Sequence, residues 1–301
     1  ANQLQRLRRR EVAPHLARID GELGAALFER DRRQVRLTSF GEEIAIRARD
    51  ILRSLDDLEG FARASRGGLV GRLRLGVIPT VAPYLLPSLL GALGRLYDGL
   101  DIHVRETLTP KLIQELNEGR LDTAIIALPA SEPSLTEIAL FTEDFVLVRP
   151  RGDQGRPTPG PEALREMKLL LLEEGHCFRD QALSFCNGDA RPAQPRDVLD
   201  ASSLSTLVQM VEASLGVTLI PEMAVAVETR SASVSVARFK SPPPTRTIGM
   251  VWRKTSPLAQ QLTQISEVVR RSSEALRQPS KPIEARDFND STASRTAPPS
   301  R

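Results

Sequence analysis

The stretch LRLGVIPTVAPYLLPSLLGALGRL, residues 73–96, decides the fold class of this 301-residue chain. Its first six residues largely alternate apolar and polar side chains and predict a β-strand, and the apolar residues after Pro83 recur at helical spacing. The alternation continues with LDIHVRE (100–106) as a strand, PKLIQELNEG (110–119) as a helix and LDTAIIAL (121–128) as a strand. Such alternation predicts an α/β fold, in which a mostly parallel sheet carries helices on both faces.

The α/β pattern extends to about residue 278. Its later part is predicted to contain the strands KLLLLEE (168–174), VTLIP (217–221) and RTIGMVWRK (246–254), and helices over 203–216 and about 258–276. The roughly 210 residues of this region are enough for two small sheet subdomains. Strands that cross between the subdomains are expected near 141–149 and 238–248.

The two flanks of the α/β region differ from it in character. Within residues 42–64 apolar side chains recur at helical spacing, at Ile44, Ile46, Ile51, Leu55, Leu58 and Phe61. A helix of that length outside a compact core usually packs on a partner helix. The glycines of SRGGLVG (65–71) then predict a hinge. Residues 279–301 are rich in proline, serine and charge, and we expect them to be disordered.

Composition excludes some classes of protein and leaves others open. The net charge of +3 is compatible with a nucleic-acid partner but does not require one. The apolar runs are far shorter than the roughly 18 residues of a membrane span, and no secretory signal pattern opens the sequence. We therefore expect a cytoplasmic protein. In that reducing setting its two cysteines are expected to serve catalysis, metal binding or redox sensing rather than a structural disulfide.

Both cysteines lie in EEGHCFRDQALSFC, residues 173–186. Taken alone, either cysteine could be a buried core residue, since free cysteine is among the most buried side chains. A zinc site is disfavoured because His176, Cys177 and Cys186 offer at most three ligands, without CxxC or HxxxH spacing. We expect no metal and no cofactor.

Residues 21–41, GELGAALFERDRRQVRLTSFG, resemble the winged part of LysR-type transcriptional regulators. The shared pattern is ELG-x-x-LF-x-R, then basic residues, then LT-x-x-G, in which Leu23, Leu27 and Phe28 would close a small core. The basic residues of the wing are Arg30, Arg32, Arg33 and Arg36. The resemblance implies that they contact DNA, whereas a bare charge run would be a solvated surface.

The N-terminal segment departs from the same pattern. Compared with the complete helix-turn-helix of the family, we expect the first two helices to be missing from this sequence, and Pro14 lies where the recognition helix is expected. We therefore expect a partial winged helix-turn-helix over residues 1–41. Residues 42–67 are expected to form the linker and dimerisation helix with its hinge, and 279–301 the disordered tail.

Three stretches resemble the peroxide-sensing OxyR subfamily of LysR-type regulators. They are LGVIPTVAPYLLPSLL (75–90), EEGHCFRDQALSFC (173–186) and RTIGMVWR (246–253). The most specific part is GHC-x-RDQA-x-x-FC, and the resemblance covers about residues 16–275. It implies a two-subdomain, periplasmic-binding-protein-like effector domain over residues 68–278.

The resemblance implies that Cys177 is the thiol that reacts with peroxide. Because the thiolate is the reactive form, its surroundings should favour negative charge. A predicted helix that begins near Cys177 would do so, and His176 and Arg179 could add positive charge. Asp180 would oppose this effect, unless it orients a donor such as Arg246.

The resemblance also pairs Cys177 with Cys186 in a disulfide after oxidation. Nine residues of helix would hold their Cα atoms roughly 13–14 Å apart, whereas a disulfide needs them within about 7 Å. The bond would therefore require local unwinding, which is the property of a two-state switch.

Two threonines complete the implied site. Thr80 and Thr109 each precede a predicted helix, and the simplest role for both is that of an N-cap. Positions at the carboxyl ends of parallel strands also face the crevice in which α/β sheets bind ligands. The resemblance implies that both hydroxyls bind peroxide beside Cys177.

The resemblance thus implies a homotetrameric peroxide-sensing activator of antioxidant genes. By resemblance it would bind promoter DNA and RNA polymerase, and glutaredoxin or thioredoxin would reduce it. Two alternatives stay open: a LysR-type regulator that responds to a small organic ligand, and a truncated sensor that no longer binds DNA. A thiol peroxidase is disfavoured because nothing in the chain resembles a peroxidase, so we do not expect an enzyme.

Overall fold

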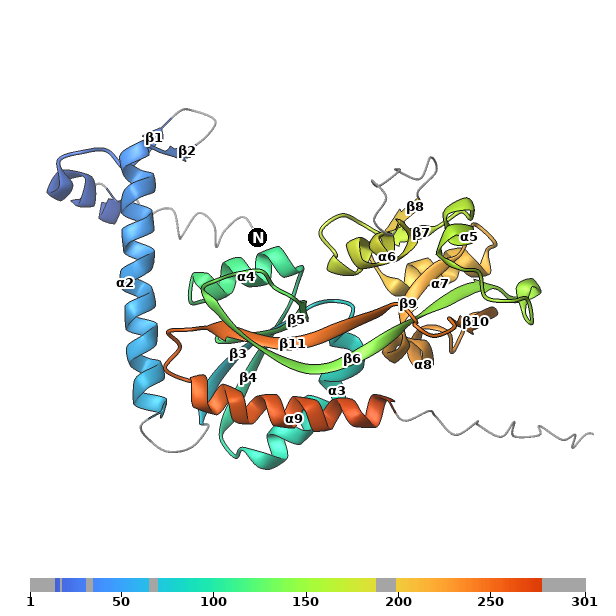
Figure 1. The fold of residues 1–301 in the computed structure, drawn as a ribbon. Coiled ribbons are helices and arrows are strands. Elements are labelled where there is room, and N and C mark those ends of the chain that lie inside the picture. The colour runs from blue at the N-terminus through green and yellow to red at the C-terminus, as the bar shows by residue number, and fades with distance from the viewer. Residues whose placement is uncertain (1–13, 17, 31–34, 65–69, 188–198, 278–301) are drawn as a thin grey trace, which may run out of the picture.

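A computed structural model describes residues 14–16, 18–30, 35–64, 70–187 and 199–277 (Figure 1). In its N-terminal part, residues 18–23 are helical, and strands β1 (Phe28–Arg30) and β2 (Val35–Leu37) form an antiparallel pair. Of the three residues expected in its core, Leu27 is buried, Phe28 is partly buried and Leu23 is 44% exposed. The described part of this unit therefore has a smaller core than the sequence predicts.

The LT-x-x-G pattern is explained by the start of the long helix α2 (Ser39–Ala64). The hydroxyl of Thr38 donates to the carbonyl of Ala26 at 2.8 Å and accepts from the backbone N–H of Gly41 at 2.9 Å. A Cβ atom at Gly41 would lie 2.1 Å from the carbonyl oxygen of Leu27, so only glycine fits there. Because Thr38 accepts from the N–H of Gly41, α2 begins at Ser39 rather than at the predicted residue 42.

Helix α2 has 26 residues and is about 39 Å long. It stands at one end of the α/β region (Figure 1). Several of its large apolar side chains are exposed, namely Ile46, Ile51, Leu52, Leu55 and Leu58. Within the described residues, no helix is both long and apolar enough to cross a membrane.

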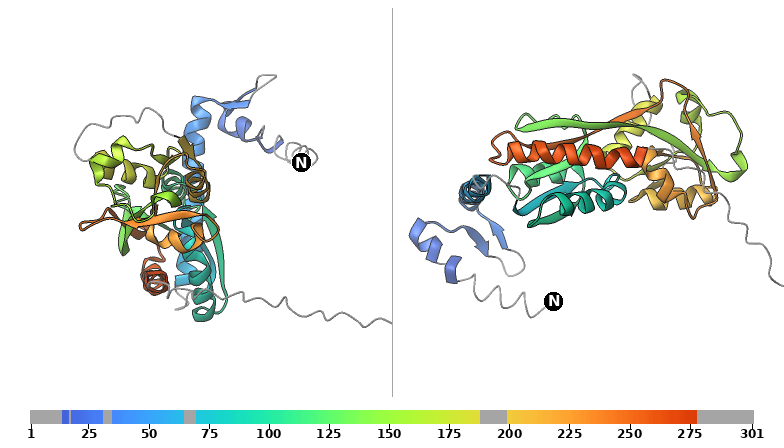
Figure 2. Two further views of the ribbon diagram at one scale, coloured as in Figure 1. Left: turned by 90° about the vertical axis from the view of Figure 1, so that its right-hand side faces the viewer. Right: turned by 90° about the horizontal axis from the view of Figure 1, so that it is seen from below.

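The first subdomain contains the parallel strands predicted from the opening stretch. They are β3 (Gly71–Val77), β4 (Leu100–Glu106) and β5 (Thr123–Leu128), and the intervening helices are α3 (Ala82–Leu96) and α4 (Thr109–Asn117). Strand β3 lies between the other two, and both pair with it in parallel. The C-terminal helix α9 (Ala259–Arg277) packs on α3 and along β6 and β11, as two views show (Figures 1 and 2).

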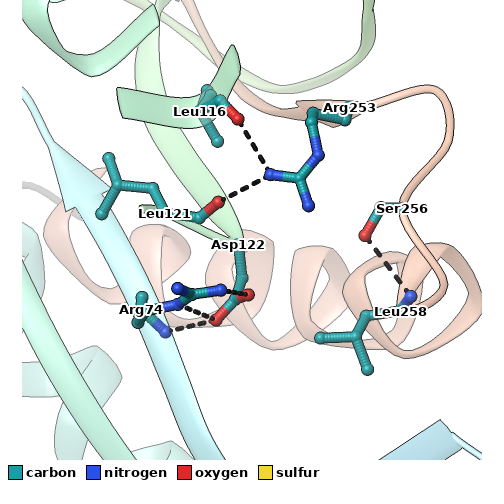
Figure 3. A network of polar contacts seen from close by, with 7 residues as sticks. All are labelled: Arg74, Leu116, Leu121, Asp122, Arg253, Ser256 and Leu258. Carbon is teal, nitrogen blue, oxygen red and sulfur yellow. Dashed lines mark hydrogen bonds and ion pairs between the residues drawn. The ribbon is translucent and has the colours of Figure 1, made fainter. Parts of the chain in front are cut away.

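A charged network joins the strands and loops of this subdomain (Figure 3). Asp122 accepts from both the backbone and the guanidinium of Arg74, at 2.7 and 2.9 Å. Buried Arg253 donates to the carbonyl oxygens of Leu116 and Leu121, at 2.8 and 3.2 Å. These bonds satisfy backbone groups where α4 ends and β5 begins, so the network has a structural role.

One strand belongs to both subdomains. Strand β6 (Leu135–Pro150) pairs with β11 (Thr245–Arg253) through its first part. Through its second part it pairs with β9 (Thr218–Pro221) and β10 (Val234–Arg238). These pairs, and that of β11 with β5, are antiparallel, so the prediction of a mostly parallel sheet is wrong for this part. The chain returns to the first subdomain between β10 and β11, so both predicted crossings lie where the sequence places them.

The second subdomain is built around β7 (Leu170–Leu172) and β8 (Leu199–Ala201), which pair in parallel. Its remaining elements are the 3-10 helices η1 (Arg151–Asp153) and η2 (Glu222–Ala224), and the helices α5 (Pro161–Glu166), α6 (Cys177–Asn187), α7 (Leu204–Glu212) and α8 (Val225–Glu228). One cluster of buried apolar residues runs through both subdomains. The predicted tail (279–301) and residues 65–69 of the predicted hinge lie outside the described residues.

Candidate functional site at the start of helix α6

Cys177 is the first residue of α6, as the sequence predicts. After β7, the backbone N–H of Glu173 donates to the carbonyl of Ala201 at 3.0 Å. Gly175 then turns the chain with φ +93°, a left-handed conformation that favours glycine. The glycine turn thus places the half-buried sulfur of Cys177 at the N-terminal end of a helix, which favours negative charge.

A small pocket brings together four of the predicted site residues: Thr80, Thr109, His176 and Cys177. Its lining also includes Ile78, Pro79, Leu108, Gly175 and Phe178, which leave it narrow, with almost no enclosed free volume. The contributing segments follow β3, β4 and β7, at the carboxyl ends of their strands. Cys177 therefore faces a mainly apolar pocket that holds two hydroxyls and one imidazole.

Thr80 is held by a buried arginine rather than capping a helix, so its expected role as an N-cap is wrong. The N-cap of α3 is Val81, and the hydroxyl of Thr80 accepts from Nη1 of Arg246 at 2.8 Å. Nη2 of Arg246 also donates to the carbonyl of Thr80 at 3.0 Å. Because its oxygen accepts from a cation, the hydroxyl of Thr80 has its own hydrogen available for another acceptor.

Thr109 is likewise not an N-cap, because that position belongs to Leu108 and α4 begins at Thr109 itself. Its Oγ1 atom is buried and has no hydrogen-bond partner among the described residues. A buried hydroxyl without a partner is costly and usually marks a functional position or a bound molecule. Since Thr109 lines the pocket of Cys177, its hydroxyl is suited to bind a small polar ligand there.

The partner of Arg246 is Glu143, which sequence reasoning missed. Nε of Arg246 donates to Oε1 of Glu143 at 2.8 Å, and the two side chains are 0% and 2% exposed. The backbone N–H of Met223 donates to the other carboxylate oxygen at 3.2 Å. The guanidinium also lies 5.3 Å from the centre of the Phe178 ring. The available signal was the acidic pair Glu143 and Asp144, which stands directly before the apolar run of β6.

Asp180 does not orient Arg246, so that expectation is wrong. Its side chain is exposed on α6, whereas Arg246 is paired with Glu143 across the β6–β11 ladder. Arg179 is also directed away from the pocket, because its Nη1 donates to the carbonyl of Leu172 and to Asp200, both at 2.7 Å. Arg179 therefore ties the first turn of α6 to β7 and β8.

His176 lines the pocket as an uncharged ring rather than as a source of positive charge. Burial lowers the pKa of His176 below its usual value of 6.5, and the carboxylate of Glu173 only partly opposes this effect. The imidazole is therefore neutral at pH 7. It can donate or accept one hydrogen bond at each ring nitrogen according to its tautomer.

This lowered pKa makes the stability of the fold depend on pH. The unfolded chain takes up a proton on His176 at higher pH than the folded chain does, so stability is lost as pH falls below about 6.5. We expect a His176→Gln variant to lose less stability than the wild type between pH 7.5 and 5.5. Urea unfolding at each pH measures this, and equal losses in the two proteins would contradict it.

Cys186 lies at the other end of α6 and is 3% exposed. Burial raises the pKa of its thiol to about 11, although the charge of Arg165 works in the opposite direction. Both cysteines are free, and the helix between them holds their Cα atoms roughly 13–14 Å apart. The two sulfurs are therefore separated in this state of the molecule, as expected.

A second cavity of about 130 Å³ lies beside the first and shares Pro79, Thr80 and His176 with it. It lies between the subdomains, where the hydroxyl of Tyr84 donates to Glu228 at 2.7 Å. Burial, together with this bond, raises the pKa of Tyr84. Ser205 donates to the second oxygen of Glu228 at 2.6 Å.

The remaining expectations concern the contacts with DNA and the absence of a metal site. Arg36 is exposed on β2, whereas Arg32, Arg33 and the side chain of Arg30 lie outside the described residues. In the described part of the chain, no cluster of His, Cys, Asp and Glu is arranged to hold a metal ion.

Comparison with known proteins agrees with this architecture. A sequence model of the LysR substrate-binding domain matches residues 66–274. A probable hydrogen peroxide-inducible genes activator from Streptomyces viridosporus is 44% identical over 255 residues, which cover 84% of this chain and 81% of the relative. The DNA-binding transcriptional dual regulator OxyR of Escherichia coli K12 is 36% identical over 264 residues, which cover 86% of this chain and 85% of the relative.

A solved structure also resembles the whole described arrangement. It is a cysteine-to-serine mutant of Corynebacterium glutamicum OxyR with bound hydrogen peroxide, 35% identical, with a TM-score of 0.69. The match covers 88% of this chain and 84% of that one. The expected fold class is thus confirmed, since the LysR effector domain is a periplasmic-binding-protein-like α/β domain. The chain therefore belongs to the LysR family of transcription regulators, which are not enzymes, and within it to the OxyR group of hydrogen peroxide-inducible activators.

Proposed function

We propose that this chain senses hydrogen peroxide through Cys177 and regulates transcription in response. The observation that carries the proposal is the buried hydroxyl of Thr109, which has no partner among the described residues and lines the pocket of Cys177. Hydrogen peroxide is small and offers two donors and four lone pairs, so it suits a narrow pocket with two hydroxyls. The Streptomyces relative named as a probable hydrogen peroxide-inducible genes activator supports the same assignment.

In the first step, the thiolate of Cys177 attacks one peroxide oxygen and the O–O bond breaks. Cysteine is oxidised to a sulfenic acid, and the second oxygen leaves as hydroxide, which takes up a proton to become water. Negative charge thus moves from the sulfur to the departing oxygen. The N-terminal end of α6 favours the charge at the start, and the hydroxyls of Thr80 and Thr109 donate to the departing oxygen.

In the second step, Cys186 attacks the sulfur of the sulfenic acid. The S–S bond forms, the S–O bond breaks, and the hydroxyl leaves as water with the proton of the Cys186 thiol. Because the two cysteines lie at opposite ends of α6, this step requires that the helix unwinds. The oxidised chain then has a second packing of its effector domain, which is the signal.

The signal is passed on through contacts with other molecules. We place a second copy of the chain on the exposed apolar side chains of α2, in a homodimer that assembles further into a homotetramer. Arg30, Arg32, Arg33 and Arg36 contact promoter DNA. RNA polymerase is the partner in activation, and glutaredoxin or thioredoxin returns the disulfide to two thiols in the cytoplasm.

Peptide mapping of the peroxide-treated protein tests this function. Trypsin cleaves after Lys168, Arg179 and Arg196 but not before Pro192, so Cys177 and Cys186 fall in peptides 169–179 and 180–196. We expect one equivalent of hydrogen peroxide to link these two peptides, and reductant to release them. In Cys186→Ser, dimedone should instead label Cys177. A treated wild-type protein with two free thiols and no label would contradict the proposal.

The cavity between the subdomains supports a second candidate, in which a small organic ligand controls the regulator. That function does not need the cysteines. A Cys177→Ser variant that still alters promoter binding when a saturating organic ligand is added would favour it over peroxide sensing.

A further inference from the structure

The C-terminal end of α6 is held by a side chain from another helix. Nε of Arg165 donates to the carbonyl oxygen of Cys186 at 2.5 Å, across 21 residues of sequence. Arg165 belongs to α5, which packs on α6 and is anchored by the fully buried Leu164 next to it. The arginine therefore reaches the last turn of α6 from a fixed position.

This bond stabilises α6 at the place where a helix most needs external partners. The last four carbonyls of a helix have no partner within it, and a cationic donor there also interacts favourably with the helix dipole. Two further contacts hold the same turn: Cys186 is buried in the core, and the ring of Phe185 packs 5.1 Å from that of Phe239. Neither of these contacts carries a charge.

Disulfide formation must break these contacts. In the folded helix the thiol of Cys186 is buried and protonated, because its pKa is raised to about 11. It becomes a nucleophile only after the last turn of α6 has opened and left the core. The bond from Arg165 to the Cys186 carbonyl must be lost before that can happen.

We infer that Arg165 is a positioning residue that restrains the C-terminal turn of α6 and so sets the rate of disulfide formation. The inference rests on the proposed function, because it concerns the step after Cys177 has been oxidised. Arg165 has no part in the first step, since it lies at the opposite end of the helix from the peroxide pocket. Its effect is on the lifetime of the sulfenic acid at Cys177 before the disulfide with Cys186 forms.

The charge of Arg165 could act in the opposite sense, because a cation favours the thiolate of Cys186. In the folded helix burial outweighs that effect, and the thiol stays protonated with its pKa raised to about 11. The hydrogen bond instead acts on the opening that exposes it, and opening comes first. We therefore expect loss of Arg165 to accelerate the second step.

The test separates the two steps by their dependence on peroxide. The rate of the first step rises in proportion to peroxide concentration, and dimedone labelling of quenched samples follows the sulfenic acid. The second step is independent of peroxide and is followed by non-reducing peptide maps. In Arg165→Met we expect an unchanged first step and a second step about tenfold faster, as for loss of a charge-assisted hydrogen bond.

Two milder variants identify the cause. Arg165→Gln keeps N–H donors without charge, and Arg165→Lys keeps both a donor and the charge, so both should stay closer to wild type than Arg165→Met. Glu166→Gln changes an exposed neighbour on the same helix and should alter neither step. If Arg165→Met does not fold, the Gln and Lys variants still report whether weakening the bond accelerates disulfide formation.

The outcomes distinguish this inference from the proposed function. A second step that is unchanged or slower in the Arg165 variants would overturn the inference, while a wild-type disulfide would leave the proposed function intact. If the wild-type protein forms no link between the two cysteines, the proposed function itself fails. An Arg165 variant with an altered first step would also overturn the inference, because the residue would then act on the peroxide pocket.

Discussion

Replacement of Glu143 by alanine is expected to lower the free energy of unfolding by about 3–5 kcal/mol. Glu143 and Arg246 form an ion pair with almost no exposed surface, and the strand register places them directly opposite each other. Without the carboxylate, the guanidinium of Arg246 is left as a buried charge without its partner. Urea unfolding followed by circular dichroism gives the free energy for each protein.

Two comparisons show that burial is the cause. Glu222 also pairs with an arginine, Arg238, but these side chains are 34% and 68% exposed. Glu222→Ala should therefore cost less than about 1 kcal/mol. The double replacement Glu143→Leu with Arg246→Met should be less destabilising than Glu143→Ala, because no unpaired charge remains. A loss below 1 kcal/mol in Glu143→Ala would mean that water reaches the pair.

Replacement of Thr109 by valine is expected to separate function from stability. The substitution exchanges a hydroxyl for a methyl group of similar size, and the hydroxyl is buried without a partner among the described residues. The folded protein should therefore become slightly more stable or stay unchanged. Its reaction with hydrogen peroxide should slow about 100-fold, as when one donor to a departing oxygen is removed.

Stopped-flow oxidation of the reduced protein and urea unfolding measure these two effects. Thr263→Val is a suitable control, because the Thr263 hydroxyl donates to the carbonyl of Ala259 on the exposed face of α9. It should leave the peroxide rate unchanged. If Thr109→Val reacts at the wild-type rate, the hydroxyl does not contact peroxide. If it is destabilised by more than about 1 kcal/mol, the hydroxyl has a structural role instead.

Local patterns in the sequence were sufficient to predict most of the fold. The alternation in LDIHVRE predicts β4 over the same residues as the structure, and the glycine turn before Cys177 predicts the start of α6. The start of α2 was predicted too late because Thr38 and Gly41 fix it through contacts with residues 26 and 27. The helical spacing of apolar residues, from which α2 was predicted, gives no information about such contacts.

The candidate site was only partly predictable, for the same reason. Thr80, Thr109 and His176 were predicted beside Cys177, and the pocket contains all four. The partner of Arg246 was not found, because Glu143 is 103 residues away and becomes a neighbour only through the pairing of β6 with β11.

The direction in which a side chain points also cannot be predicted from its position in the sequence alone. Arg179 lies two residues after Cys177, yet it contacts Leu172 and Asp200 rather than the pocket. Asp180 was expected to orient a donor but is exposed. In a helix, neighbours in sequence point to different sides, so adjacency in the chain does not imply adjacency in space.

The sixteen residues of β6 form one continuous strand, about 53 Å long, that passes through both subdomains of the effector domain. Its first part is paired with β11 and its second with β9 and β10, so cross-strand hydrogen bonds stiffen it along its length. The register with β11 shifts at one point, where β6 has one extra residue, so the strand can bend there while its pairing continues on both sides. Because both subdomains share this strand, repacking around α6 that turned its second part would also turn the part that pairs with β11.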